Sequence, residues 1–289
     1  MSIVLKNAAF AATIREKGAE LSSLANLATG QEYIWHGDPA WWTGSAPVLF
    51  PIVGSLRNGT YSFGGRSYPL SNHGFARGSE FVVEHETPET AVFLLSSSEA
   101  TRAVYPFDFQ LRVGFALQHN GLSVTYRVRN TGSGRMYFSI GSHAAFVVPF
   151  AGGALENYYV LFDREESAER WSIKDGLIDP DRTAPAFDTS RTIGLSRTLF
   201  DEGALVFKHL HSRSFSLRNN LNARSVTVVT EGAPFFALWA KSGAPFVCIE
   251  PWHGISDSAN ASGELTQKEG ILYLDPEGSF DTGYRIDIG

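Results

Sequence analysis

The chain has 289 residues, of which 43% are hydrophobic and 19% charged, so it can bury a sizeable core and does not have the composition of a disordered protein. Its formal net charge of -6 gives no basic footprint for nucleic acid or for an anionic membrane surface, and an uncharged partner fits better. The single cysteine, Cys248, excludes an internal disulfide and a multi-cysteine zinc site, and its apolar neighbours predict a buried small hydrophobe.

The amino-terminal segment does not have the pattern of a signal peptide. Lys6 and Arg15 stand around an apolar stretch that is too short for a signal-peptide core followed by a cleavage site. No run of about 18 apolar residues occurs anywhere in the chain. We therefore expect a soluble, cytoplasmic protein with no membrane partner, and the sequence leaves its oligomeric state open.

Short runs of alternating, β-branched and aromatic residues predict an all-β protein. They recur at intervals near ten and are separated by Gly, Asn, Asp, Ser and Pro, whereas helix signals are sparse. The clearest predicted strands are, in chain order, 80–85, 91–98, 109–118, 122–130, 226–231 and 235–241.

The segment 122–130 is the cleanest predicted strand. It alternates apolar residues with Ser, Thr and Arg, as expected of a strand with one face on the core and the other in water. Glycines near 121 and 132 supply the hairpin turns, and the stretch from Asp175 to Ser196 is predicted to be a long connection. Since no domain boundary is apparent, we expect one domain over residues 1–289, a large antiparallel β-sandwich.

Two of the eight histidines have a context that suggests chemistry. His73 lies in the turn-like segment SNHGFARG, where it either takes part in a polar site or caps a strand end while Arg77 forms a surface ion pair. His143 lies in the apolar segment FSIGSHAAFVVPF, so its imidazole is either a hydrogen-bonded core group or a functional group in a cleft of low dielectric.

The strand-like run APFVCIE ends at Glu250, and Pro251 follows it. Glu250 is either a tuned base or a solvated charge at the strand end. Trp252 either stacks on a sugar or packs under the sheet, and Arg57 either reaches into a cleft or pairs with an acidic residue. The sequence contains no phosphate loop, dinucleotide fingerprint or HExxH motif, so no cofactor and no metal are indicated.

Four motifs together carry a family resemblance: FPIVGSLRNGTY, SNHGFARG, GSHAAF and CIEPW, in this order. They resemble the aldose 1-epimerase superfamily, in particular its small bacterial branch, and the likeness runs from EKGAELSSL near the amino terminus to LDPEGS near the carboxyl terminus. The resemblance implies the galactose mutarotase-like supersandwich, a cleft that binds a small sugar, and catalysis without a cofactor.

The resemblance also implies roles for individual residues. Glu250 matches the general base for the anomeric hydroxyl, His143 the general acid for the ring oxygen, and His73 the group that holds and polarises that oxygen. The expected substrate-binding residues are Arg57, Asn72, Arg77 and Trp252, which lie inside these motifs, and Asp201, which lies in the more diffusely matching segment LFDEGALVF.

Ring opening requires an ionised Glu250 and a protonated His143, and a nearby carboxylate raises the pKa of an imidazole. The expected activity is that of an isomerase acting on a free hexose. A hexose-6-phosphate epimerase would need a cluster of basic residues, for which Arg57 and Arg77 are candidates. A carbohydrate-binding protein that catalyses nothing is the third possibility.

Overall fold

Strands account for nearly all the regular structure, and the strand pairs that build the sheets are antiparallel. The computed structural model describes residues 1–289. The predicted all-β class and the predicted antiparallel sheets are confirmed. None of the helices is long and apolar enough to cross a membrane.

The largest sheet has nine strands and includes the carboxyl-terminal strand near its centre. In spatial order the strands are β17 (Thr192–Gly194), β14 (Tyr158–Phe162), β19 (Ser214–Asn219), β20 (Ser225–Thr230), β24 (Ser279–Ile288), β10 (Gly121–Asn130), β9 (Phe109–Gln118), β8 (Thr90–Ser96) and β7 (Val82–Glu86). The alternation predicted for 122–130 is confirmed, because alternate residues of β10 are buried.

The second large sheet has eight strands and carries the residues singled out in the sequence. Its strands are β16 (Leu177–Ala184), β15 (Arg170–Lys174), β18 (Leu205–Lys208), β21 (Phe235–Trp239), β22 (Phe246–His253), β12 (Ile140–Ser142) and β4 (Val48–Leu49), with β13 (Ala144–Val147) paired to β22.

Three small sheets and a few short helices complete the fold. The small sheets contain β1 (Ser2–Lys6), β2 (Phe10–Arg15) and β3 (Glu20–Asn26); β5 (Thr60–Phe63) and β6 (Arg66–Pro69); and β11 (Met136–Phe138) and β23 (Leu272–Leu274). The helices are α1 (Glu99–Val104) and the 3-10 turns η1 (Arg57–Gly59), η2 (Ala76–Gly78), η3 (Leu155–Asn157) and η4 (Leu265–Gln267).

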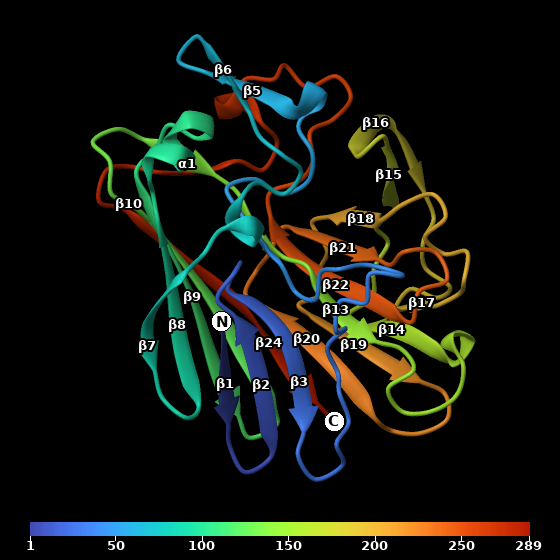
Figure 1. Cartoon of the computed structure of the whole chain (residues 1–289). Coiled ribbons are helices and arrows are strands. Elements are labelled where there is room, and N and C mark those ends of the chain that lie inside the picture. The colour runs from blue at the N-terminus through green and yellow to red at the C-terminus, as the bar shows by residue number, and fades with distance from the viewer.

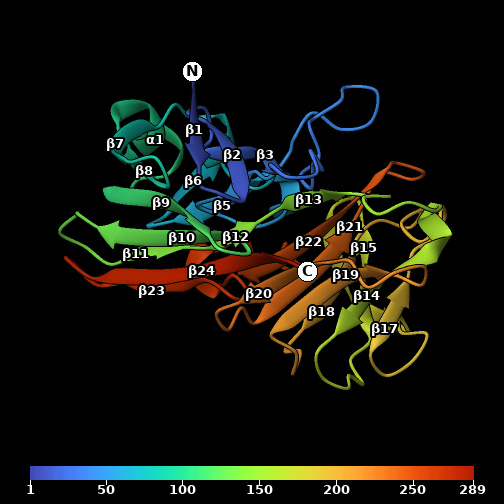
Figure 2. The ribbon, with the colours of Figure 1, turned by 90° about the horizontal axis from the view of Figure 1, so that it is seen from below.

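The sheets pack through aromatic side chains. Phe215 of β19 stacks on Phe236 of β21 with ring centroids 3.8 Å apart, which joins the nine-stranded sheet to the eight-stranded one. Phe50, next to β4, packs on Phe109 of β9. Figures 1 and 2 both show β1, β2 and β3 against one face of the β9, β10 and β24 region. The sheets thus share one continuous apolar core.

The prediction of one long connection from Asp175 to Ser196 is wrong. Residues 177–184 form β16, which pairs with β15 in a hairpin, and 192–194 form β17 at the edge of the nine-stranded sheet. The sequence of β16 is mostly polar and contains Pro180, so it shows no alternating apolar pattern. Main-chain pairing at a sheet edge forms this strand, and side-chain periodicity does not reveal it.

Candidate active site

The geometry of the candidate site starts from the register of β22 with its neighbours. Trp252 pairs with Gly141 of β12, and Ile249 pairs with Ala144 of β13. The same register continued between these pairs puts His143, the residue that separates β12 from β13, directly opposite Glu250. The His143 Nε2 and Glu250 Oε2 atoms are 3.5 Å apart. Two residues that are 107 positions apart in the sequence therefore become cross-strand neighbours.

Strand alternation determines which face of the sheet carries this pair. Phe236 points toward the nine-stranded sheet, where it stacks on Phe215. Its neighbour Ala237 therefore points to the opposite face, and Ala237 pairs with Glu250. The pair thus lies on the outer face of the eight-stranded sheet, which loops cover.

His73 is fixed by two hydrogen bonds to Gly54. The His73 main-chain N–H donates to the Gly54 carbonyl at 2.9 Å, and the Gly54 N–H donates to His73 Nδ1 at 3.0 Å. Because Nδ1 accepts a hydrogen bond, the proton of the neutral ring is on Nε2. Burial, and secondarily the charge of Arg77, lowers the pKa of His73 to about 3. His73 is therefore a neutral donor through Nε2, and its ring is edge-on to that of His143 with centroids 5.5 Å apart.

Burial also controls the protonation of the His143 and Glu250 pair. It raises the pKa of Glu250 well above its usual value, and it lowers that of His143 well below, with neighbouring His73 adding to the second effect. The expectation that the carboxylate would raise the pKa of the imidazole is therefore wrong for this protein, because loss of solvation outweighs the attraction between the partners. Burial therefore favours the neutral form of each partner.

Two atoms of the pair make no hydrogen bond although they are buried. These are His143 Nδ1 and Glu250 Oε2. Buried polar atoms in native proteins nearly always have a partner, so each exception needs an explanation, and a bound ligand would provide one here. His143 keeps 8% of its surface exposed, whereas Glu250 keeps 1%.

Tryptophans that the sequence analysis did not single out surround His143. Trp42 stacks on its imidazole with centroids 4.9 Å apart, and Trp239 contacts it edge-on at 5.5 Å. Trp239 lies on the same face as Glu250 by strand alternation. The sequence signal for Trp42 was the Trp41–Trp42 doublet in the segment HGDPAWWTGSAP. The Gly and Pro residues of this segment predict a loop, and the core-facing side of a strand or helix does not explain two large aromatic residues there.

Trp252 shares the face of Glu250 but is packed, with 5% of its surface exposed. Its indole N–H donates to the Ser142 carbonyl at 3.2 Å, and it belongs to a small apolar cluster with Val53 and Ile255. Of the two alternatives for Trp252, the packed one holds. Cys248, two residues before Glu250 on the same face, is fully buried as predicted.

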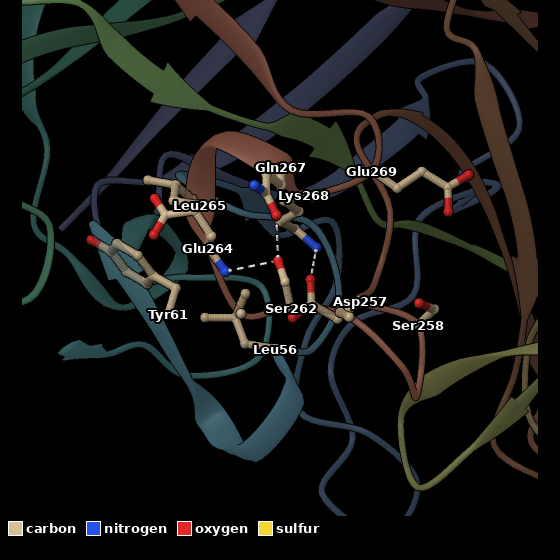
Figure 3. Close-up of a pocket in the computed structure, with 12 residues that line it drawn as sticks. Leu56, Tyr61, Asp257, Ser258, Ser262, Glu264, Leu265, Gln267, Lys268 and Glu269 are labelled. Carbon is tan, nitrogen blue, oxygen red and sulfur yellow. Dashed lines mark hydrogen bonds and ion pairs between the residues drawn. The ribbon is translucent and has the colours of Figure 1, made fainter. Parts of the chain in front are cut away.

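The segment that follows β22 contains a buried ion pair, and its acidic partner also binds the main chain of Arg57. Lys268 Nζ lies 2.7 Å from Asp257 Oδ1, and the other carboxylate oxygen of Asp257 accepts the Arg57 N–H at 2.9 Å. Figure 3 shows this pair at the wall of a cavity of about 100 Å³, with Ser262 and Gln267 beside it. The Arg57 guanidinium donates to the Ala261 carbonyl, so it is held on this loop.

Asn72 borders a groove of about 790 Å³. This groove lies beside the turn that carries His73, and Ser55 donates to the Asn72 side-chain oxygen at its wall. The lining contains Asp175 and several hydroxyl, amide and apolar groups but no lysine or arginine. An uncharged ligand suits this surface.

Arg77 borders a different groove, of about 260 Å³, which touches Trp42. Arg15 and Lys17 line it as well, and Glu20 is its acidic residue, already paired with Arg15. Asp201 lies apart from both grooves, in an exposed turn where it accepts a hydrogen bond from Ser242 at 2.7 Å. The structure thus brings His73, His143 and Glu250 together, puts Asn72 and Arg77 in flanking grooves, and holds Arg57 and Asp201 on loops.

Comparisons with known proteins give matches over most or all of the chain. The model of the family described as aldose 1-epimerase matches residues 1–273. Protein LacX of Lactococcus lactis subsp. lactis is 30% identical over 100% of this chain and 99% of its own length. The structure of a galactose mutarotase related enzyme from Lactobacillus acidophilus is 36% identical, with a TM-score of 0.95 over 100% of this chain and 97% of that one. A galactose mutarotase-like protein from Lactobacillus casei is 30% identical, with a TM-score of 0.93 over both whole chains.

Proposed function

Because the chain belongs to the aldose 1-epimerase family, we propose that it is a cytoplasmic mutarotase that interconverts the α and β anomers of a free aldose by opening and reclosing the ring. The observation that carries the proposal is the cross-strand pair of His143 and Glu250, 3.5 Å apart and buried, with the Nε2 donor of His73 beside it. A site that only binds sugar has no need of an acid opposed to a base.

In the proposed reaction Glu250 takes the proton of the anomeric hydroxyl and His143 donates a proton to the ring oxygen. The bond between C1 and the ring oxygen breaks, a carbonyl forms at C1, and rotation about the C1–C2 bond followed by the reverse steps gives the other anomer. Burial favours the neutral form of each partner, so the required ion pair forms when one proton moves from the Glu250 carboxyl to the His143 imidazole. His73 Nε2–H polarises the ring oxygen throughout.

The test follows the optical rotation of freshly dissolved α-D-glucose and α-D-galactose with and without the protein. We expect faster relaxation to the same equilibrium, and a loss of roughly a hundredfold or more in Glu250→Gln and in His143→Asn, because each removes one proton-transfer group. Sugar affinity measured by calorimetry should be largely retained. Unchanged rates in Glu250→Gln would disprove the assigned base, and sugar binding without any acceleration would indicate a carbohydrate-binding protein.

A second candidate substrate is a hexose 6-phosphate, which the groove of Arg15, Lys17 and Arg77 favours because a phosphate dianion binds best among several cations. The larger groove beside Asn72, without any basic lining residue, favours the free sugar. The same assay with α-D-glucose 6-phosphate decides between them. Acceleration confined to the phosphate ester, inhibited by inorganic phosphate and lost in Lys17→Gln/Arg77→Gln, would establish the second candidate.

A further inference from the structure

We propose that His143, Cys248 and Glu250 form a binding site for Zn²⁺ or a similar borderline divalent cation, and that the bound ion switches the site off. The proposal that the metal binds depends only on the geometry of the three side chains. The proposal that it inhibits rests on the proposed function, since inhibition requires a reaction.

The ligand arrangement follows from two adjacent strands. Cys248 and Glu250 are two residues apart on β22 and project from the same face, and His143 is the direct cross-strand neighbour of Glu250. The three ligand atoms lie within 4.8 Å of one another. Tetrahedral zinc with bonds of about 2.0–2.3 Å places its ligands roughly 3.5 Å apart, so small side-chain rotations bring the three into range.

The chemistry of the three groups matches zinc. Thiolate, imidazole and carboxylate are its usual ligands, and three protein ligands with one open position is the arrangement of an accessible zinc site. A thiolate and a carboxylate together balance the two charges of the ion, so the complex with neutral His143 carries no net charge. A neutral complex avoids most of the cost of burying a charge beside Trp42 and Trp239.

Two of the three ligand residues have unpartnered, buried polar atoms. Glu250 Oε2 and His143 Nδ1 make no hydrogen bond, and these side chains are nine-tenths or more buried. Binding a cation would therefore break no hydrogen bond of the carboxyl oxygen and would give it a partner. Cys248 binds as the thiolate and Glu250 as the carboxylate, so the thiol proton and the carboxyl proton both leave to the solvent.

Inhibition follows from competition for lone pairs. A cation that holds the Glu250 carboxylate and the His143 ring withdraws the base and the acid together. Cys248 has no part in the proton transfers, so its removal should weaken the metal site and leave the reaction intact. Cys248 is therefore the residue that separates metal binding from catalysis.

The binding experiment uses Co²⁺ as a spectroscopic probe and Zn²⁺ as its competitor, on the full chain freed of metal. We expect one Co²⁺ per chain with a thiolate-to-cobalt absorption band, removed by one equivalent of Zn²⁺. In Cys248→Ala the band should vanish and Zn²⁺ affinity should fall by roughly 100-fold or more. Undiminished affinity in Cys248→Ala, or a cobalt spectrum without thiolate character in the wild type, would overturn the proposal.

A matched control tests for binding at the surface. The exposed His211, whose Nδ1 lies 3.3 Å from Glu166, is a separate histidine and carboxylate pair. We expect His211→Gln to bind Zn²⁺ as tightly as the wild type does. If His211→Gln loses Zn²⁺ affinity and Cys248→Ala does not, the ion binds at the surface, which contradicts the proposal.

The inhibition experiment measures mutarotation with added Zn²⁺ and then with excess EDTA. We expect wild-type activity to fall and to recover on chelation, while Cys248→Ala retains activity and resists the ion. Equal inhibition of both proteins would disprove the switch. If neither protein accelerates mutarotation, the proposed function fails while the cobalt titration still decides the metal site.

Discussion

Single side chains in this protein are held in charge states that water alone would not produce. Outside the site, His253 is the clearest case: burial lowers its pKa to about 4, and its Nε2 is 2.9 Å from the hydroxyl of Thr282 between the sheets. In the folded protein the His253 ring stays neutral at pH values where the same ring in the unfolded chain takes up a second proton and becomes charged.

This predicts acid lability. The unfolded imidazole takes up a proton below about pH 6.5, whereas the folded one does so only near pH 4, so the free energy of unfolding falls as the pH drops across this window. We expect His253→Gln, which keeps a donor for Thr282 but does not titrate, to lose about 1–2 kcal/mol less than the wild type between pH 7 and pH 4.5. Urea denaturation at the two pH values measures this.

The control is the exposed His119, whose replacement by Gln should leave the pH dependence of stability as it is in the wild type. Parallel curves for wild type and His253→Gln would show that the buried ring is not the source of the acid lability.

At the scale of elements, the turn before η1 positions His73. Gly54 has a φ of 73°, and a Cβ there would lie 1.9 Å from Ser256 Oγ, so only glycine fits. Gly59 has nearly the same φ, 67°, but a Cβ there would meet no atom within 4 Å.

This pair of glycines gives a controlled prediction. We expect Gly59→Ala to cost about 1 kcal/mol of stability from the left-handed backbone alone, and Gly54→Ala to cost at least about 2 kcal/mol because a collision is added. Gly54→Ala should also slow mutarotation by roughly tenfold or more, since the N–H that fixes the His73 tautomer shifts. Urea denaturation and polarimetry measure the two effects; equal losses in both variants would refute the positioning role of Gly54.

The ion pair of Lys268 and Asp257 makes a second prediction at this scale. Side-chain exposures of 2% and 4% mean that Lys268→Met leaves a buried, uncompensated carboxylate, at a cost of about 3–5 kcal/mol. The double variant Lys268→Met/Asp257→Asn should be more stable than Lys268→Met.

The control is Lys208→Met, which removes the better exposed pair with Glu269 and should cost about 1 kcal/mol or less. A double variant no more stable than Lys268→Met would mean that the cost comes from lost packing of the lysine chain.

Elements differ in how far the sequence predicts them. The strands β9 and β10 bury alternate residues over ten positions each, so periodicity predicts them well. The polar strand β16 has no such pattern. For the site, apolar context drew attention to His143 and a following proline to Glu250, but their direct opposition depends on pairing between distant strands, which local patterns do not encode. The same holds for Trp42, which reaches His143 from a loop.

We propose that the whole molecule is a single domain, as the sequence predicts. The carboxyl-terminal strand β24 pairs with β10 on one side and β20 on the other, so the last residues complete the middle of the nine-stranded sheet. We expect one calorimetric unfolding transition whose enthalpy equals the van't Hoff enthalpy. Two resolved transitions, or a stable proteolytic half, would indicate separate domains.

The opposition of His143 and Glu250 across paired strands has a consequence for how such enzymes diversify. The backbone ladder of β12, β13 and β22 fixes the spacing of His143 and Glu250. Surrounding loops without a residue packed on this pair, such as the tip of the β15–β16 hairpin, take no part in that ladder, whereas the loop 36–44 carries Trp42, which stacks on His143. Under the proposed function, exchange of such loops should therefore alter which sugar is admitted and leave the proton transfers untouched. Libraries that randomise these loops should yield changed substrate preference far more often than lost chemistry.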